Sequence, residues 1–203
     1  MYKVFFNQKP IVLTTEIIIP KEDSPLFFVK FTNKKFILKV LKSKKVKMLY
    51  LYHSKEERLN YYFLSMFKVI EAAGGIVKNL KTNKFLFIFR NKKWDLPKGR
   101  INKNEEVKNA AIREVEEETG VQSLSIIKPL STTYHIFKKN RKYRLKKTFW
   151  YLMNTQYIGK LTPEAKENIE KAVWVDKSSL DSLKSKMYQN INLVISNYFD
   201  LYK

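Results

Sequence analysis

A short acidic stretch near the middle of the chain has the residue types and spacing of a metal-dependent active site. Within Gly99–Val121, glutamates stand at positions 114, 116, 117 and 118. On an ideal helix at about 100° per residue, Glu114, Glu117 and Glu118 fall among or beside the apolar side chains, whereas Glu116 faces solvent. An ordinary amphipathic helix keeps its carboxylates opposite the apolar stripe. Carboxylates that point inward repel one another and are costly to desolvate unless a cation compensates them.

A bound divalent cation is the compensation that this arrangement favours. Carboxylate oxygens gathered on one helical turn suit Mg²⁺ or Mn²⁺, which are hard ions that prefer oxygen ligands. The alternative is a glutamate-rich helix with ordinary pairing between residues four apart. Zinc chemistry is disfavoured, because the chain has no cysteine and only two histidines.

These carboxylates need a helix held against a sheet, and the surrounding sequence predicts both. The helix is expected over roughly 104–119, ended by Gly120, and a loop containing Pro97 and Gly99 precedes it. Strands are expected before and after it, at Ile76–Asn79, Lys84–Arg90, Ser123–Ile127, Thr132–Phe137, Lys146–Met153 and Lys171–Val175. The chain after residue 180 has apolar positions at helical spacing, so a C-terminal helical region is also predicted.

The first part of the chain is expected to be built from short strands. They are predicted at Tyr2–Phe6, Ile11–Thr14, Phe27–Phe31, Phe36–Val40 and Val46–Tyr52. A helix should follow, started by a capping box of Ser54 and Glu57. We therefore predict an accessory segment of unassigned role at residues 1–70 and a catalytic domain at 71–203.

The residues around the acidic stretch resemble the Nudix box. Five residues separate Gly99 from Glu105, and seven more separate Glu105 from Arg113–Val115. One residue then separates Val115 from the pair Glu117-Glu118, and one more separates that pair from Gly120-Val121. Ala72–Gly75 and Trp94–Gly99, before the box, also resemble the family, and the likeness covers about residues 70–176. The resemblance implies an α/β fold, an α/β/α sandwich with a mixed sheet, to which the N-terminal α+β segment is added.

The resemblance also implies an activity and a set of site residues. Such enzymes hydrolyse a nucleoside diphosphate linked to another moiety, by attack of water on phosphorus. By position, Glu114, Glu117 and Glu118 would bind Mg²⁺ or Mn²⁺, assisted by the carbonyl oxygen of Gly99. One of these glutamates, or a carboxylate outside the box, would act as the base that takes a proton from the water. Outside the box we favour Glu167, with Glu164 and a merely solvated loop carboxylate as the alternatives.

Three positions of the box, Gly99, Arg113 and Gly120, are expected to hold its geometry. Arg113 should pair with Glu105 or Glu117 and so fix the helix relative to the loop before it. Gly99 and Gly120 should supply turns that a side chain would obstruct.

Basic residues outside the helix are candidates for binding the phosphates of a substrate. They are Arg90, Lys98, Arg144 and Lys147. The last two belong to a basic hairpin, residues 138–147, centred on Asn140. Its alternate residues would bind a polyphosphate if its strands flank the cleft, and the alternative is a solvated lysine-rich turn.

The net charge of +21 is compatible with an anionic substrate. Nucleic acid is possible as a partner but not favoured, because 34 of the 40 basic residues are lysines, as a coding bias would produce, and only six are arginines. No apolar run approaches the roughly 18 residues of a membrane span, and no signal peptide is evident. We expect a cytoplasmic protein with no membrane partner, and a homodimer is compatible with the sequence.

Two classes of function compete. The first is a Mg²⁺-dependent pyrophosphohydrolase acting on a small polyphosphate or nucleotide, and Trp94–Gly99 with Lys147–Leu152 most resembles hydrolases of dinucleoside and diphosphoinositol polyphosphates. The second is a Nudix-fold module that senses a ligand or binds RNA without hydrolysis; such modules usually lose box glutamates, and all are present here. A pyrophosphohydrolase of RNA 5′ ends would combine the two.

Overall fold

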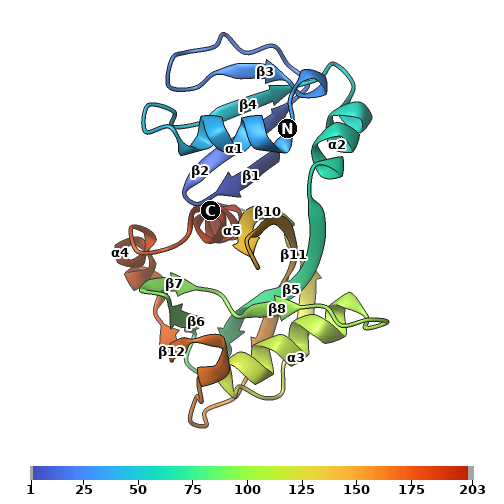
Figure 1. Cartoon of the computed structure of the whole chain (residues 1–203). Helices are drawn as coiled ribbons and strands as arrows, with labels where there is room; N and C mark the ends of the chain where they lie inside the picture. The colour runs from blue at the N-terminus through green and yellow to red at the C-terminus, as the bar shows by residue number, and fades with distance from the viewer. Residues whose placement is uncertain (1, 201–203) are drawn as a thin grey trace. The chain divides into compact units, whose positions relative to one another are not determined.

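The computed structural model describes residues 2–200, which form two compact units (Figure 1). The first unit runs as far as Ile70 and also contains Tyr134–Lys146. The second unit contains Glu71–Thr133 and the chain from Lys147 onward. Nearly all of the basic hairpin therefore belongs with the N-terminal part of the chain, from which it is remote in sequence.

The first unit is a sheet packed against two helices. Its strands run in the order β10-β1-β2-β4-β3; β1 and β2 pair antiparallel, and the other ladders are parallel. The elements are β1 (Tyr2–Phe6), β2 (Lys9–Thr14), β3 (Leu26–Phe28), the 3-10 turn η1 (Val29–Phe31), α1 (Lys34–Lys42), β4 (Leu49–Tyr52), α2 (Glu56–Ser65) and β10 (Thr133–Lys139). Buried side chains from both helices and all the strands except β3 form one core.

One segment of the first unit has a different structure from the one expected. Phe36–Val40, predicted to be a strand, lies inside the helix α1. The side chain of Asn33 caps this helix by accepting a hydrogen bond from the amide of Phe36 at 2.9 Å. The buried side chains of the helix follow helical spacing: Ile37, Leu38 and Leu41. Five residues were too few to separate this spacing from strand alternation.

The predicted capping box of α2 is also wrong. The helix begins at Glu56, and its N-cap position, Lys55, makes no side-chain capping bond. The backbone amide of Lys55 instead donates to Nδ1 of His53 at 3.0 Å. Ser54 is thus one residue too early to cap the helix.

The second unit is a sheet between two layers of helix (Figure 1). Its central strands run β12-β6-β5-β11, with β7 paired to β6, β8 to β5 and β9 to β11. The strands are β5 (Lys68–Asn79), β6 (Phe85–Arg90), β7 (Lys93–Asp95), β8 (Lys98–Arg100), β9 (Ser125–Pro129), β11 (Lys142–Thr155) and β12 (Ile169–Val175). The helical elements are α3 (Val107–Thr119), η2 (Ala165–Glu167), η3 (Lys177–Ser179), α4 (Leu180–Lys184) and α5 (Gln189–Asp200).

Alternation along the strands assigns the two faces of this sheet. On β6, Phe85 and Phe87 join the core beneath α4 and α5, whereas Leu86 joins the core beneath α3. On β5, Ile76 and Val77 divide in the same way. The chain contains both parallel and antiparallel ladders, so the predicted α/β fold with a mixed sheet and flanking helices is confirmed. Within residues 2–200, no helix is both long enough and apolar enough to cross a membrane.

Candidate active site

The helix α3 presents the acidic stretch, and its packing explains why some glutamates point inward. Its buried apolar side chains, Ala110, Ala111 and Val115, pack on the sheet. Glu118 follows on the same side and its side chain is only 1% exposed, whereas that of Glu117 is 51% exposed. Glu116, expected to face solvent, is partly buried. The helix ends where Gly120 adopts φ 71°, the left-handed conformation expected at that position.

Gly99 lets β8 lie directly against α3. A Cβ atom at this position would overlap the carboxylate of Glu114. The carboxylate therefore lies beside the backbone of residue 99, in the middle of β8. A side chain at this position would force the Glu114 carboxylate to move.

Replacing Gly99 with Ala is accordingly expected to lower the free energy of unfolding by about 1–3 kcal/mol, because the added methyl group overpacks the contact with Glu114. Activity should fall as well, since the carboxylate must move. Urea unfolding and steady-state kinetics measure both effects. Gly75→Ala is the matched control: its Cβ would meet the flexible end of the Met153 side chain at 2.9 Å and the backbone oxygen of Tyr151 at 3.1 Å, so it is also overpacked, but no carboxylate has to move. Its stability should fall as well, while its activity should fall less than that of the Gly99 variant. Equal losses of activity in the two variants would contradict the role of Gly99 in placing Glu114.

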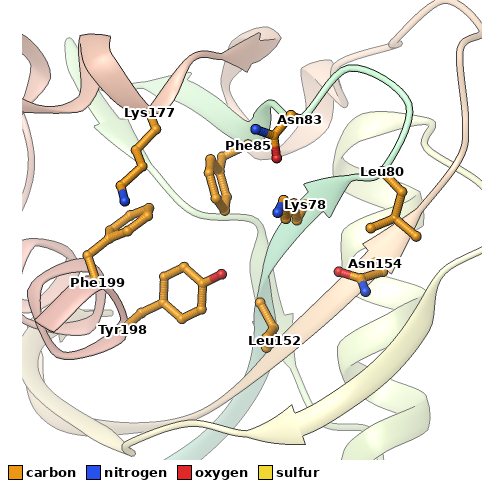
Figure 2. A pocket seen from close by; sticks show the side chains of 9 residues that line it. All are labelled: Lys78, Leu80, Asn83, Phe85, Leu152, Asn154, Lys177, Tyr198 and Phe199. Atoms are coloured by element: carbon orange, nitrogen blue, oxygen red, sulfur yellow. The ribbon is translucent and has the colours of Figure 1, made fainter. Parts of the chain in front are cut away.

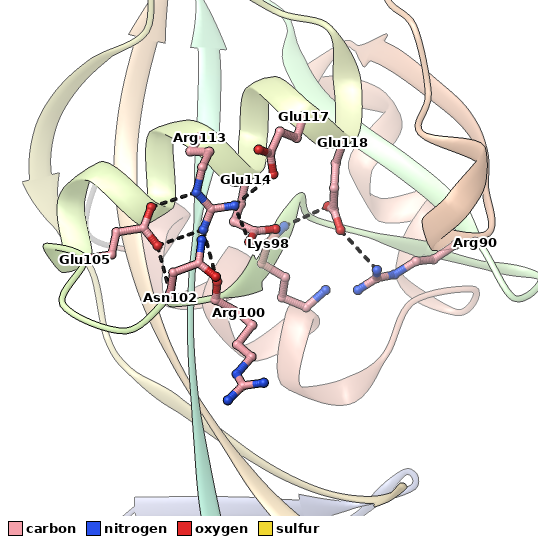
Figure 3. Close-up of polar contacts among 9 residues, drawn as sticks. All are labelled: Arg90, Lys98, Arg100, Asn102, Glu105, Arg113, Glu114, Glu117 and Glu118. Carbon is pink, nitrogen blue, oxygen red and sulfur yellow. Dashed lines mark hydrogen bonds and ion pairs between the residues drawn. The ribbon is translucent and has the colours of Figure 1, made fainter. Parts of the chain in front are cut away.

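Arg113 joins three carboxylates (Figure 3). It binds Glu105 through Nε and Nη2, at 2.7 and 2.8 Å. Its Nη1 donates to Glu114 and to Glu117, both at 2.8 Å. Nη2 also donates to the carbonyl oxygen of Arg100 at 3.1 Å, which ties the helix to the end of β8. Both pairings expected for Arg113 are present, and the pairing with Glu114 is an addition.

Glu118 is held by a second group of residues (Figure 3). One carboxylate oxygen accepts a hydrogen bond from the backbone amide of Lys98 at 2.8 Å, and the other pairs with Arg90 at 3.2 Å. Arg90 and the Lys98 ammonium group also pair with Asp95, at 3.0 and 2.6 Å. Asp95, Lys98 and Glu118 are all buried. The loop before the helix is thus fixed to the last turn of α3 by buried charges.

Asp95 is the member of this group that sequence reasoning missed. Burial alone would raise its pKa, but the charges of Lys98 and Arg90 outweigh burial and hold the pKa below the ordinary value. The residue is therefore ionised and structural. The sequence contained a signal for it, because Asp95 is an acidic residue directly between two apolar ones, Trp94 and Leu96.

Burial dominates the electrostatics of the inner glutamates. It raises the pKa of Glu118 to about 7, although Lys98 and Arg90 oppose the shift. Burial also raises the pKa of Glu114, which Arg113 opposes. Hydrogen bonds from Arg113 and from the amide of Asn102 instead lower the pKa of Glu105 to about 2. The surroundings therefore favour the ionised form of Glu105, whereas burial disfavours the ionised forms of Glu114 and Glu118.

A bound divalent cation would favour the ionised forms of Glu114 and Glu118 against the effect of burial. The available donors are the carboxylates of Glu114, Glu117 and Glu118 and the carbonyl oxygen of Gly99, an all-oxygen set that suits Mg²⁺ or Mn²⁺. Among residues 2–200, no three acidic or histidine side chains form a ready-made metal cluster. Arg113 takes up one oxygen each of Glu114 and Glu117, but the Glu114 oxygen that lies beside Gly99 makes no bond to it. The donor set therefore fits a hard cation.

The loop before β12 lies against the end of α3. The amide of Glu164 donates to the backbone carbonyl oxygen of Glu118 at 3.2 Å, and that of Thr162 to Thr119 at 2.8 Å. Glu167, in η2, is exposed, and its charge acts on both Arg90 and Glu114. The structure therefore brings Glu167 to the box glutamates, and its role as the base stays a prediction.

The four basic candidates have different surroundings. Arg90 and Lys98 lie at the site, but both are committed to Asp95, and Lys98 is buried. Lys147 pairs with Glu71 at 3.1 Å, and its ammonium group lies 4.4 Å from the centre of the Phe149 ring. Arg144 belongs to the first unit. Substrate binding by these side chains stays a prediction, and for Lys98 it would require the ammonium group to leave Asp95.

A separate cavity of about 390 Å³ lies in the second unit (Figure 2). Its walls are Lys78, Leu80, Asn83, Phe85, Leu152, Asn154, Lys177, Tyr198 and Phe199. Phe85, Leu152 and Tyr198 belong to the core beneath α5, on the face opposite α3. The cavity is therefore not part of the carboxylate site.

Comparison with known proteins gives a family model and named relatives. The model described as NUDIX domain matches residues 69–196. An RNA pyrophosphohydrolase of Bartonella henselae is 31% identical over 123 residues, which cover 53% of this chain and 70% of that protein. A MutT NUDIX hydrolase from Burkholderia pseudomallei superimposes with a TM-score of 0.50 at 21% identity, over 64% of this chain and 98% of the other. A NUDIX hydrolase from Nitrosomonas europaea superimposes with a TM-score of 0.50 at 19% identity, over 66% of this chain and 90% of the other.

Proposed function

Because the chain belongs to the Nudix family and is a hydrolase of pyrophosphate bonds, we propose that it is a Mg²⁺- or Mn²⁺-dependent enzyme that cleaves a nucleotide-linked polyphosphate. The observation that carries this proposal is geometric: the carboxylate of Glu114 lies against the backbone of Gly99, and that of Glu118 accepts a hydrogen bond from the amide of the adjacent Lys98. All box glutamates are present, which speaks against a module that only senses a ligand.

The reaction is attack of water on a phosphorus atom of the substrate. A divalent cation, when bound, neutralises phosphate charge and lowers the pKa of water. Glu114, Glu117 and Glu118 hold the cation together with the carbonyl oxygen of Gly99. Arg113 is a positioning residue that orients Glu114 and Glu117, as Arg90 and the amide of Lys98 orient Glu118.

The proton of the attacking water goes to a carboxylate, and we assign this role to Glu167. Its exposure leaves the carboxylate accessible to water and substrate, and its charge acts on Glu114 and Arg90 at the site. Glu164, the alternative, is fixed through its backbone amide to the end of α3. Proton transfer to a positioned carboxylate typically contributes about 10²- to 10⁴-fold to a rate.

The 5′-triphosphate end of RNA is the substrate that we favour over free dinucleoside polyphosphates. Amino-acid composition alone did not favour nucleic acid as a partner, and the named relatives reverse that preference. Relatives named RNA pyrophosphohydrolase match this chain at 31% identity, and the match covers 70% and 73% of their lengths. A triphosphate end has the same phosphoanhydride chemistry as a small nucleotide, so the carboxylate site itself would not distinguish the two.

A product-resolved assay tests the function. The full chain is incubated with Mg²⁺ or Mn²⁺ and, separately, a 5′-triphosphate RNA, a dinucleoside tetraphosphate and a nucleoside triphosphate, and the products are identified by mass. Release of pyrophosphate or of single phosphates from the RNA, abolished by chelator and by Glu118→Gln, is the expected result. Cleavage of the dinucleoside tetraphosphate alone would replace the RNA assignment. Binding without any cleavage would overturn the enzymatic proposal.

A further inference from the structure

Positive charge is concentrated in the first unit. Residues 1–70 and 134–146 hold 20 of the 40 basic residues but only five of the 19 acidic residues. This unit therefore carries a net charge of +15 out of +21, on 83 of the 203 residues. A coding bias toward lysine would enrich both units, but it would not deplete one of them in acidic residues. The imbalance favours an anionic partner for the first unit.

Two exposed aromatic rings, those of Phe28 and Phe31, lie close together in this unit. They belong to the segment Phe28–Phe36, which we call the aromatic segment. Phe28 is 51% exposed and Phe31 81%, whereas the ring of Phe36, 37% exposed, packs against that of Phe27 at 4.9 Å. The rings of Phe28 and Phe31 are 6.5 Å apart. The segment leaves β3, at the end of the strand order, and runs through η1 into α1 (Figure 1). Large aromatic side chains are usually buried, so two exposed rings this close together indicate a surface available for stacking.

Lysines interleave with these rings. The ammonium group of Lys30 lies 5.8 Å from the centre of the Phe31 ring. Lys34 and Lys35 are exposed, and among residues 2–200 neither has a carboxylate within ion-pairing distance. Elsewhere in this unit, Lys45 and Lys47 do have such partners, Glu22 and Asp23.

The position of Lys34 and Lys35 in α1 is electrostatically unfavourable for the helix alone. They occupy its first turn, which contains no acidic residue. Unsatisfied amides and the helix dipole already make this end positive, and cations there typically cost about 0.3–1 kcal/mol each. The same arrangement attracts phosphate groups. Rings and uncompensated cations therefore coincide on one segment.

We propose that the aromatic segment binds single-stranded RNA, with bases stacked on Phe28 and Phe31 and phosphates paired with Lys30, Lys34 and Lys35. The inference rests on the proposed RNA substrate, for which it supplies a second point of attachment. Stacking platforms beside a basic groove are how proteins bind single strands without reading their sequence. A protein partner fits less well, because lysine is depleted in protein–protein interfaces.

The test is direct binding of a fluorescent oligouridine with a 5′-hydroxyl end, which offers no triphosphate to the carboxylate site. Phe31→Ala is expected to weaken binding by the full-length protein on the order of 10-fold, because the ring contributes stacking alone. Lys34→Ala with Lys35→Ala should reduce the slope of log affinity against log salt by about 1.4, since each phosphate contact to a single strand contributes about 0.7.

Matched controls separate this surface from general charge and exposure. Tyr61→Ala removes another exposed ring of the first unit, and Lys81→Ala with Lys186→Ala removes two exposed lysines of the second. Both controls should bind the oligouridine as the wild type does. Thermal melting confirms folding, and hydrolysis of a nucleoside triphosphate should be the same in all variants.

The outcomes distinguish this inference from the proposed function. Equal loss of RNA binding in Phe31→Ala and Tyr61→Ala, or no loss in either, would overturn the role of the aromatic segment and leave hydrolysis unaffected. If Phe31→Ala and the double lysine variant lose RNA binding while no polyphosphate is cleaved, the aromatic segment is upheld and the enzymatic proposal falls. Oligouridine binding by neither the wild type nor the variants would also overturn the inference.

Discussion

Glu118→Gln is expected to lower turnover about 10²- to 10³-fold while the protein stays folded. The substitution keeps the shape of the side chain and an oxygen that can accept from the amide of Lys98. It removes the negative charge that a cation and the water beside it require. Arg90 loses one partner but keeps Asp95.

The same substitution should not lower the melting temperature in the presence of a chelator. Burial raises the pKa of Glu118, so the folded protein favours the uncharged form and ionisation costs stability as the pH rises above the ordinary value. Glutamine imitates the uncharged form. The measurements are kcat and KM on the best substrate, calorimetric titration with Mn²⁺, and thermal melting at pH 8 with chelator.

Glu116→Gln is the matched control. Glu116 is two residues from both Glu114 and Glu118, so on a helix its side chain points away from those two proposed ligands. It should keep activity within about 2-fold of the wild type, as expected for a substitution outside the reacting groups. If the Glu116 and Glu118 variants lost activity equally, the assignment of ligands to one side of α3 would be wrong.

The sequence predicted the second unit better than the first for a physical reason. The helix α3 has long apolar periodicity and a glycine at its end, so its C-terminus was located correctly. Its start was placed too early, because Glu105 is engaged with Arg113 and Asn102 and is not helical. In α1, by contrast, the pattern is short and the decisive N-cap, Asn33, lies outside the window that suggested a strand.

Contacts within the site were predictable where they follow the helix, and not where they cross the fold. Arg113 and Glu117 are four residues apart, so their pairing follows from helix geometry. The contact of Arg90 with Glu118 depends on how β6 packs beside α3, which spacing in the sequence does not determine. Arg144 belongs to the first unit, although it precedes Lys147 of the second by only three residues. Tertiary packing decided these placements.

Arg113→Ala is the substitution expected to destabilise the site most, by about 1–3 kcal/mol in the free energy of unfolding. It removes the hydrogen bonds to Glu105, Glu114 and Glu117 and the one to the carbonyl of Arg100. Three carboxylates then lie close together without their shared cation. Arg113→Lys should recover only part of the loss, because an ammonium group cannot bind three carboxylates in fork geometry.

Two conditions should change the size of this loss. Mg²⁺ or Mn²⁺ should reduce it, because a bound cation compensates Glu114 and Glu117 in place of the guanidinium group. The part due to Glu105 should shrink as the pH falls: its pKa is about 2 when folded, so the stabilisation is complete above the ordinary glutamate range and is lost as the pH drops toward 2. Urea unfolding at pH 7.5 and pH 3, with and without Mg²⁺, measures both effects.

Arg58→Ala, which replaces an exposed arginine of α2, is the control and should change the free energy of unfolding by less than about 0.5 kcal/mol. An Arg113→Ala protein that unfolds as the Arg58 variant does, and turns over substrate as the wild type does, would show that Arg113 does not position the carboxylates.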